Sequence, residues 1–431
     1  MTVAAELEPL VRALVPGELP VAVRMWDGST LGPTDTGACV VIKSSRALRR
    51  LVWAPNELGL GRAYVAGELD IEGDIYAALG LRDAVAGAAD APAEVRLGRG
   101  SRRRAVAAAR RLGALGRPLP PPPEEARLKG RRHSRARDAA AVAHHYDVGN
   151  EFYRLVLGPT LTYSCGYFET PDTSLDDAQT AKYELICRKL GLQPGMRLLD
   201  VGCGWGGMVL HAAAHHGVTA VGVTLSRNQQ ELAAKRVAEA GLEDRIEIRY
   251  QDYRDIHDGP YDAISSIGMF EHVGAERLGD YFGRLHSLLR PEGRLLNHAI
   301  SRPAGEGGRA RFASKSFIDA YVFPDGELLE VGTSVSAMQQ HGFEVRDVES
   351  LREHYARTLR HWVDNLERSW AEAVAMAGEG RARVWRLYMA ASAVNFEAGR
   401  TAIHQTLGVR AGPGGASGMP LTRREFLTAS S

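Results

Sequence analysis

The stretch RLLDVGCGWGG, residues 197–207, constrains the fold of this 431-residue chain more than any other. A short apolar run comes directly before closely spaced glycines, and an apolar segment, Met208 to His215, follows at once. Glycine adopts positive φ easily and lets backbone N–H groups at a helix N-terminus approach a bound ligand. This order predicts a strand, a tight turn and a helix that together hold a nucleotide-like ligand.

Strand and helix patterns continue to alternate after the glycine-rich stretch. Strands are predicted at 219–223, 246–250, 261–267 and 293–300, and helices at 226–240 and 275–289. Such alternation specifies a doubly wound parallel sheet, in which ligands bind at the carboxyl ends of the strands. The residues of interest fall at those ends: Gly202, Thr224, Asp252, Glu271 and His298. A later strand is predicted at 343–348, followed by helices at 351–376 and 381–407.

The residues beside the glycines favour one kind of nucleotide. A nicotinamide site would have an acidic residue at the end of the second strand, where this chain has Thr224 and Leu225. The sequence also lacks the GK[ST] of a phosphate-binding P-loop. Asp200 before the glycines, with Gln251 and Asp252 after the third strand, suits a nucleoside that carries an amino acid. The pattern therefore favours S-adenosylmethionine.

Composition shifts divide the chain into four segments. Residues 1–88 are expected to form a small α+β domain that associates with lipid or dimerises, and 89–138 a basic, proline-rich linker. The main domain covers 139–409, with an insertion at 301–341 that reads as a lid, a binding loop or disorder. Residues 410–431 read as a flexible tail.

The linker concentrates positive charge. Between Arg96 and Arg137, fourteen Lys or Arg stand against two Glu, a net charge of +12 in a chain whose total is +1. This asymmetry indicates either a solvated connector or a contact with anionic lipid head groups. Nucleic acid is disfavoured, because aromatic residues for base stacking are not interleaved with the arginines.

Other features bear on location and metals. The four cysteines are scattered without a CxxC pair, which argues against disulfides and structural zinc and for a reducing cytoplasm. The N-terminus does not read as a signal peptide, and no apolar run is long enough to span a membrane. His144 and His145 are adjacent and point in different directions, so no metal site is expected. The protein is expected in the cytoplasm, peripheral at the inner face of the membrane.

Several long stretches resemble the cyclopropane-fatty-acid synthases and their mycolic-acid and methylene-branching relatives. They lie in order between residues 139 and about 405: HHYDVGNEFY, LTYSCGYF, LLDVGCGWGG, VTLSRNQ, SIGMFEHVG, LLNHAIS, FPDGELL and HYARTLRHW. The N-terminal domain also resembles that of full-length members, around WDGSTLGP and LGLGRAYVAGELDIEGD. Short mycolic-acid enzymes lack this domain, which favours phospholipid acyl chains as substrate. The resemblance implies an α/β class I S-adenosylmethionine-dependent methyltransferase, with a Rossmann-like doubly wound sheet, the small N-terminal domain and C-terminal helices.

The resemblance also implies two sets of site residues. S-adenosylmethionine would contact Tyr163, Ser164, Gly202, Gly204, Thr224, Gln229, Gln251 and Ile267. A bicarbonate ion would be held by Cys165, Glu271, His298, the backbone of Ile300, and Tyr355. The family often has HTI where this chain has His298-Ala299-Ile300, which leaves the bicarbonate ligands intact. The match around Tyr355 is looser than the others.

These residue types suit methyl transfer to an alkene. The sulfonium methyl is the electrophile, and aromatic faces stabilise the carbocation that forms on the acyl chain; the candidates are Tyr146, Phe152, Tyr167, Phe168 and Phe270. A base then removes a proton. The expected product is a mid-chain methylene branch, which a separate reductase would convert to a methyl branch; ring closure to a cyclopropane is the alternative.

A dimer is expected from the family. The rival functions are a methyltransferase for a small metabolite or nucleic acid and a non-catalytic lipid-binding protein.

Overall fold

The computed structural model describes residues 1–15, 17–86, 99–128, 130, 134–135, 137, 145–146, 148–304 and 316–427, with only the backbone at 14, 82–86 and 99–102. The chain forms two compact units. One comprises Met1–Arg127, Arg309–Pro324 and Trp370–Val394, and the other Leu128–Gly308, Asp325–Ser369 and Asn395–Ser431. Three separate segments contribute to each unit, so the units are interleaved along the sequence.

The second unit is built on an eight-stranded sheet with the order β11-β12-β9-β8-β5-β6-β7, and β10 pairs with β9. Strands β5 to β9 are parallel, and β12 is antiparallel to both β9 and β11. The strand bounds are β5 Arg197–Val201, β6 Thr219–Thr224, β7 Ile246–Tyr250, β8 Tyr261–Ile267, β9 Leu289–Arg302, β10 Leu329–Glu330, β11 Phe343–Ser350 and β12 Ala402–Arg410. The parallel, doubly wound core agrees with the prediction from strand–helix alternation.

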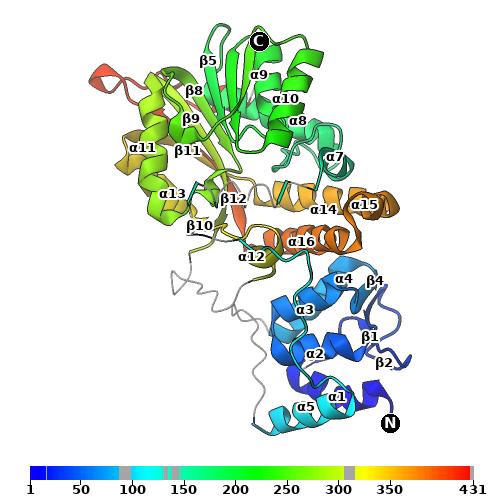
Figure 1. Ribbon diagram of the computed structural model, residues 1–431. Helices are drawn as coiled ribbons and strands as arrows, with labels where there is room; N and C mark the ends of the chain where they lie inside the picture. Colours follow the sequence, from blue (N-terminus) through cyan, green and yellow to red (C-terminus); the bar gives the residue numbers. More distant parts are fainter. Residues whose placement is uncertain are drawn as a thin grey trace. The chain divides into compact units, whose positions relative to one another are not determined.

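Helices cover both faces of this sheet (Figure 1). The helices of this unit are α7 Asn150–Leu157, α8 Leu175–Leu190, α9 Gly207–His216, α10 Arg227–Glu239, α11 Leu278–Leu288, α13 Val331–Gln340, α14 Arg352–Arg368 and α17 Arg424–Leu427. Short 3-10 turns lie at Tyr253–Asp255, Phe270–His272, Ala275–Arg277 and Pro413–Gly415. Consecutive strand residues face opposite sides, so Leu199 packs in one core cluster with Phe282 of α11, whereas Leu198 packs in another with Met208 of α9.

The first unit contains a four-stranded sheet, in the order β2-β1-β3-β4. Its strands are β1 Ala22–Arg24, β2 Thr30–Leu31, β3 Ala38–Ile42 and β4 Leu69–Gly73. Its helices are α1 Val3–Leu14, α2 Ser45–Trp53, α3 Glu57–Val65, α4 Ile75–Ala86, α5 Arg99–Arg111, α12 Phe317–Tyr321, α15 Trp370–Ala377 and most of α16 Glu379–Glu397. Buried Arg50 and Glu68 form an ion pair of 2.7 Å inside this unit.

The division into segments differs from the one expected from composition. The first unit extends to Arg127, and the region expected as an extended linker contains helix α5. Glu125, from the proline-rich stretch, is buried and pairs with Arg62 at 2.8 Å. The insertion at 301–341 contributes α12 to the first unit and β10 and α13 to the second, while residues 305–315 lie outside the described residues. Tertiary packing thus orders much of what local composition marked as connector.

Two predictions near the C-terminus are wrong. The helix expected over 381–407 ends at Glu397, and residues 402–410 form β12, between β9 and β11. The chain reverses at Gly399, where φ is +69°, and the inserted strand is almost entirely buried. The expected flexible tail also packs: Phe426 of α17 is buried against the cluster that contains Leu198, and Arg423 pairs with Asp347.

No helix in the described part of the chain combines the length and the apolar character that crossing a membrane requires.

Candidate active site

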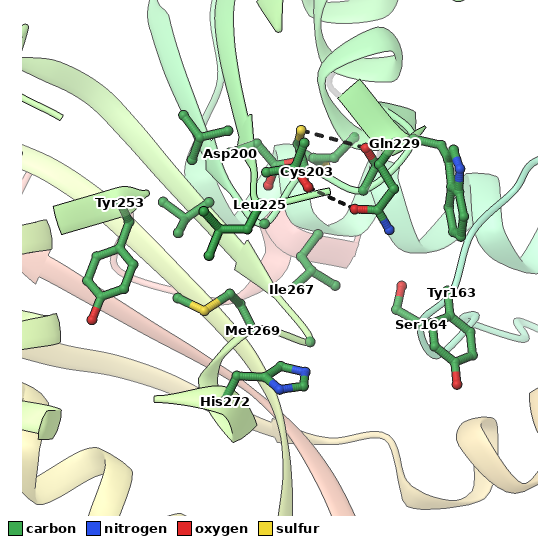
Figure 2. Close-up of a pocket in the computed structure, with 18 of the residues that line it drawn as sticks. Tyr163, Ser164, Asp200, Cys203, Leu225, Gln229, Tyr253, Ile267, Met269 and His272 are labelled. Atoms are coloured by element: carbon green, nitrogen blue, oxygen red, sulfur yellow. Dashed lines mark hydrogen bonds between the residues drawn. The ribbon is translucent and has the colours of Figure 1, made fainter. Parts of the chain in front are cut away.

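A pocket lies at the carboxyl ends of β5, β6 and β8, where the strand order of the sheet reverses. All eight residues predicted to contact the cofactor line it: Tyr163, Ser164, Gly202, Gly204, Thr224, Gln229, Gln251 and Ile267. Figure 2 shows Tyr163 and Ser164 on the side of the pocket opposite Tyr253, with Met269 and His272 between them along the wall. The sheet therefore brings together residues from positions 163 to 267.

The glycine-rich turn forms one wall of this pocket. The backbone N–H groups of Gly202 and Cys203 both donate to the carbonyl of Val223, at 3.0 Å, which ties the turn to β6. Gly202 has φ +78°, and a Cβ there would lie 3.0 Å from Cγ of Met269. A side chain at this position would thus be strained and would also push into the opposite wall.

Side chains after β6 and β7 are fixed by short hydrogen bonds. Thr224 Oγ1 donates to Gln229 Oε1 at 2.8 Å, and both residues are buried. Ser226 caps α10, because its Oγ accepts from the backbone N–H of Gln229 at 3.3 Å. The backbone N–H of Gln251 donates to the carbonyl of Thr224 at 3.1 Å. These bonds hold the polar groups that would recognise a nucleoside.

Two buried charged groups adjoin the pocket. Asp200 accepts a hydrogen bond of 2.6 Å from Ser265 Oγ, and burial raises its pKa to about 6. Lys182 of α8 donates to Ser164 Oγ at 3.0 Å, and burial lowers its pKa to about 7. Sequence analysis did not single out Lys182, since a lysine within a mixed helical pattern reads as solvated. A buried lysine is rare enough to be informative, but burial is visible only in the folded chain.

The five residues predicted to hold bicarbonate, which we call the buried cluster, are connected through main-chain hydrogen bonds and strand pairing. Cys165 Sγ lies 3.7 Å from the carbonyl of Leu351, which also accepts from the N–H of Tyr355 at 3.1 Å. Leu351 N–H donates to the carbonyl of Ile403, whose register partner across β12 and β9 is Ile300. A continuous path thus links this cysteine and tyrosine to β9.

Glu271 contacts the same segment of β9. Its Oε1 accepts from the N–H of Ile300 at 2.6 Å. His298 lies two residues before Ile300 and so projects from the same face of β9. The cluster adjoins the pocket through chain neighbours: Ser164 precedes Cys165, and Met269 and His272 flank Glu271.

The electrostatics of this cluster follow from burial. Burial raises the pKa of Glu271 to about 7 and raises that of Cys165. Burial, with Lys182 next in effect, lowers the pKa of His298 well below its usual value, so the ring is neutral. Gln405 Nε2 lies 3.3 Å from His298 Nδ1, which leaves Nε2 as the ring position that carries a proton.

Two buried polar atoms of the cluster have no hydrogen-bond partner among the described residues, namely Glu271 Oε2 and His298 Nε2. Buried polar groups are normally satisfied, so each requires an explanation. A carboxylate oxygen accepts a hydrogen bond and a protonated imidazole nitrogen donates one. A small group with both a hydroxyl and anionic oxygens, such as bicarbonate, fits this pair.

Comparisons with known proteins identify the family. The family described as mycolic acid cyclopropane synthetase matches residues 133–406. A probable fatty acid methyltransferase of Mycobacterium tuberculosis is 44% identical over 416 residues, 94% of each chain. Another, of Pseudomonas putida, is 38% identical over 98% of this chain and 99% of its own.

Solved structures match somewhat less than two thirds of this chain. A mycolic acid cyclopropane synthase complexed with SAH and CTAB aligns with a TM-score of 0.60 at 37% identity, over 63% of this chain and 98% of its own. The cyclopropane synthase MmaA2 of Mycobacterium tuberculosis aligns with a TM-score of 0.59 at 36% identity, over 64% and 98%. A coclaurine N-methyltransferase, at 19% identity and a TM-score of 0.54, shares the fold alone.

Proposed function

This chain belongs to the mycolic acid cyclopropane synthetase family, and on that premise we propose that it transfers the methyl group of S-adenosylmethionine to the cis double bond of unsaturated phospholipid acyl chains. Its fold is that of the class I methyltransferases. The observation that carries the proposal is a nucleoside-type pocket together with a buried acceptor, Glu271, and a buried donor, His298; Glu271 lies next in the chain to the pocket residue His272.

The pocket residues would hold the cofactor in named roles. When bound, S-adenosylmethionine supplies an electrophilic methyl group. Gly202 allows the ligand to approach the backbone, and the hydrogen-bonded pair of Thr224 and Gln229 presents polar atoms at the end of β6. Asp200 and Lys182 set the charge of the pocket floor.

The acyl chain requires apolar surroundings and a stabiliser for positive charge. Tyr146 lines the pocket, and its ring centroid lies 6.3 Å from that of Tyr163 and 5.8 Å from that of Trp205. Aromatic faces stabilise a cation by about 2 kcal/mol or more when water is excluded. Phe270, beside Glu271, and the buried Phe152 and Phe168 are further candidates.

Proton removal is the role that we assign to the buried cluster. A bound bicarbonate would supply a small base there. Cys165, Glu271, His298, the N–H of Ile300 and Tyr355 would hold it. Glu271 would accept from the ion's hydroxyl and His298 would donate to its charged oxygen, which accounts for both unpartnered atoms. A neutral His298 is required for this arrangement, as its lowered pKa provides.

The product that we favour is the mid-chain methylene branch, with a cyclopropane as the alternative. Proton loss after a hydride shift gives the branch, and direct proton loss from the new methyl gives the ring, so the same residues serve both. The relatives that span both units are named fatty acid methyltransferases, whereas the cyclopropane mycolic acid synthase 1 of Mycobacterium tuberculosis covers only 62% of this chain. This difference supports phospholipid acyl chains over mycolic acids.

We also propose that the protein works at the inner face of the cytoplasmic membrane, as a dimer, and that a methylene product passes to a separate reductase. Exposed Arg103, Arg104 and Arg110 on α5 support a contact with anionic head groups, because basic residues near such a surface contribute about 1 kcal/mol each.

The decisive experiment is lipid analysis of a host that makes oleoyl phospholipids and expresses this chain. Acyl chains should gain the mass of one CH₂ per modified double bond. Proton resonance spectra then separate the products, because a methylene branch retains olefinic protons and a ring does not. Unchanged acyl chains, with methyl transfer to nucleic acid or small metabolites instead, would overturn the proposal. Lipid binding without any mass gain would favour a non-catalytic lipid-binding protein.

A further inference from the structure

A separate cluster of metal-ligating side chains lies between α8 and α9, and none of its members lines the cofactor pocket. Donor atoms of Cys187, His211 and His216 all lie within 4.8 Å of one another. Glu184 joins them, because its Oε2 lies 3.2 Å from His211 Nε2 and 3.0 Å from His216 Nε2. Four potential ligands of three chemical types therefore converge.

Helix geometry explains why residues so separated in sequence meet. Glu184 and Cys187 are three apart on α8 and so project from the same face. His211 lies on the facing side of α9, and His216 is the last residue of that helix. The two helices approach closely where Gly207 begins α9, since a Cβ there would lie 2.2 Å from the hydroxyl of Tyr183. The ligands are thus held by two packed helices rather than by loops.

Although the cysteines lack the CxxC spacing of common zinc motifs, we propose that Cys187, His211, His216 and Glu184 bind one Zn²⁺ ion. One thiolate, two imidazoles and one carboxylate are ligands that zinc accepts in a tetrahedral arrangement. Bonds of about 2.0–2.3 Å place such ligand atoms roughly 3.3–3.8 Å apart, so side-chain adjustments of about 1 Å suffice. The thiolate and the carboxylate together neutralise the charge of the ion, which a partly buried site requires.

The surroundings of the cluster leave the ligands available. Arg188 Nε lies 3.4 Å from Glu184 Oε1, the carboxylate oxygen that does not contact the histidines. Oε2 can therefore face the metal while Arg188 orients the carboxylate from behind, as outer groups do in metal sites. Cys187 is fully buried, and its thiol proton passes to solvent when the metal binds.

The proposed zinc site shares helix α9 with the cofactor pocket. The first residues of α9, Gly207 and Met208, line the cofactor pocket, and two of the proposed zinc ligands, His211 and His216, lie toward the other end of the same helix. A bound ion would fix α9 to α8 and so hold the helix N-terminus at its ligand. Because the metal binds the folded chain, it should also raise the melting temperature.

The test uses the untagged full chain, freed of metal by chelation and titrated with Co²⁺ and Zn²⁺. Co²⁺ should produce the visible absorption of a tetrahedral site together with a thiolate-to-cobalt charge-transfer band. Zn²⁺ should then bleach both, with one equivalent retained through gel filtration and a rise in melting temperature. These readouts are independent of methyl transfer, so failure here and failure of the proposed enzyme function are distinguishable.

Matched variants assign the ligands. Cys187→Ala should abolish the charge-transfer band, whereas Cys39→Ser, at a cysteine in the other unit, should leave it unchanged. His216→Asn should weaken Zn²⁺ binding at least about tenfold, whereas His215→Asn, at the exposed neighbouring histidine, should not. Should Cys187→Ala fail to fold, the His216 and His215 pair decides alone. Absence of the cobalt bands in the wild-type chain, or their persistence in folded Cys187→Ala, would overturn the proposal.

Discussion

The cofactor pocket and the buried cluster behind it share a wall, yet they are built differently. The pocket takes Gly202, Thr224 and Gln251 from the ends of three adjacent parallel strands, and Gly202 reaches solvent. The cluster takes Cys165, Glu271 and His298 from a loop, a 3-10 turn and the inside of β9, and all three are buried. Binding a cofactor requires access from solvent, whereas removing a proton from an acyl chain benefits from a dry site. Five measurements, in order of decreasing effect, probe this difference.

The largest effect is expected at the buried cluster. Glu271→Gln should lower kcat by about 10²–10⁴-fold, because it removes a group that the base requires while preserving its shape. Cofactor affinity should change little, since Glu271 does not line the pocket. Single-turnover transfer from labelled S-adenosylmethionine measures the first quantity, and equilibrium binding the second. Glu276→Gln, at an exposed carboxylate five residues on, is the control. Normal turnover in Glu271→Gln would remove this residue from the site.

A substitution in the pocket should instead lower cofactor affinity. Gly202→Ala combines strain at φ +78° with a Cβ 3.0 Å from Met269, whereas Gly204→Ala, at φ +55°, meets no atom of the described residues within 4 Å. Strain of about 1–3 kcal/mol corresponds to a loss of cofactor affinity of roughly 5- to 150-fold for Gly202→Ala. The Gly204 variant should lose less. Calorimetric titration with S-adenosylhomocysteine measures both, and equal losses would contradict the role assigned to the wall at Met269.

The pH dependence should distinguish the two regions within one protein. Because the pKa of Glu271 is raised to about 7, kcat/KM should fall about tenfold per pH unit below that value, as the carboxylate becomes protonated. Cofactor affinity should lack this step. The profile should be measured from about pH 5.5 to about pH 8, which spans the pKa of Glu271. A flat profile over that range would contradict an ionised Glu271 in catalysis.

The free energy of unfolding should decrease as pH rises over the range in which kcat/KM increases. The folded pKa of Glu271 lies above the unfolded value of 4.5, so the stability gained by burying the protonated form is present below pH 4.5 and is lost as pH rises through about 7. Denaturant unfolding of the wild-type chain and of Glu271→Gln should therefore differ in slope with pH across this interval. Parallel slopes would contradict the raised pKa.

The smallest effect is expected at Tyr355. Tyr355→Phe removes the hydroxyl that we propose holds the ion and preserves the ring, whose centroid lies 4.8 Å from that of Phe396. The loss of one hydrogen bond costs about 0.5–1.5 kcal/mol, so kcat should fall roughly 2- to 13-fold. Transfer rates with the Phe variant check this. A loss as large as that of Glu271→Gln would show that Tyr355 acts directly on the proton.

The sequence predicts the strands and the turn that form the pocket better than it predicts the elements around them, because the former follow from local patterns. Strand–helix alternation and the spacing of Gly202, Thr224 and Gln251 predict a doubly wound sheet, because parallel strands end at one common edge. The pattern predicts helix as far as residue 407, where the structure has β12 from residue 402, since HQTLGVR is apolar enough for either structure and only its place between β9 and β11 decides. The resemblance to a family named the residues of the buried cluster, but it could not reveal that Leu351 and Ile403 connect them.

By itself, the sequence determined the parallel core, the turn at Gly202 and the types of residue at the strand ends, because each follows from local backbone preference and hydrophobic period. The tertiary structure alone decided burial and proximity over long separations in sequence. It buried Lys182 beside Ser164, left Glu271 Oε2 and His298 Nε2 without partners among the described residues, and brought Cys187 to His211 and His216. The physical reason is desolvation: a side chain's charge state and its need for a partner depend on which other elements exclude water from it.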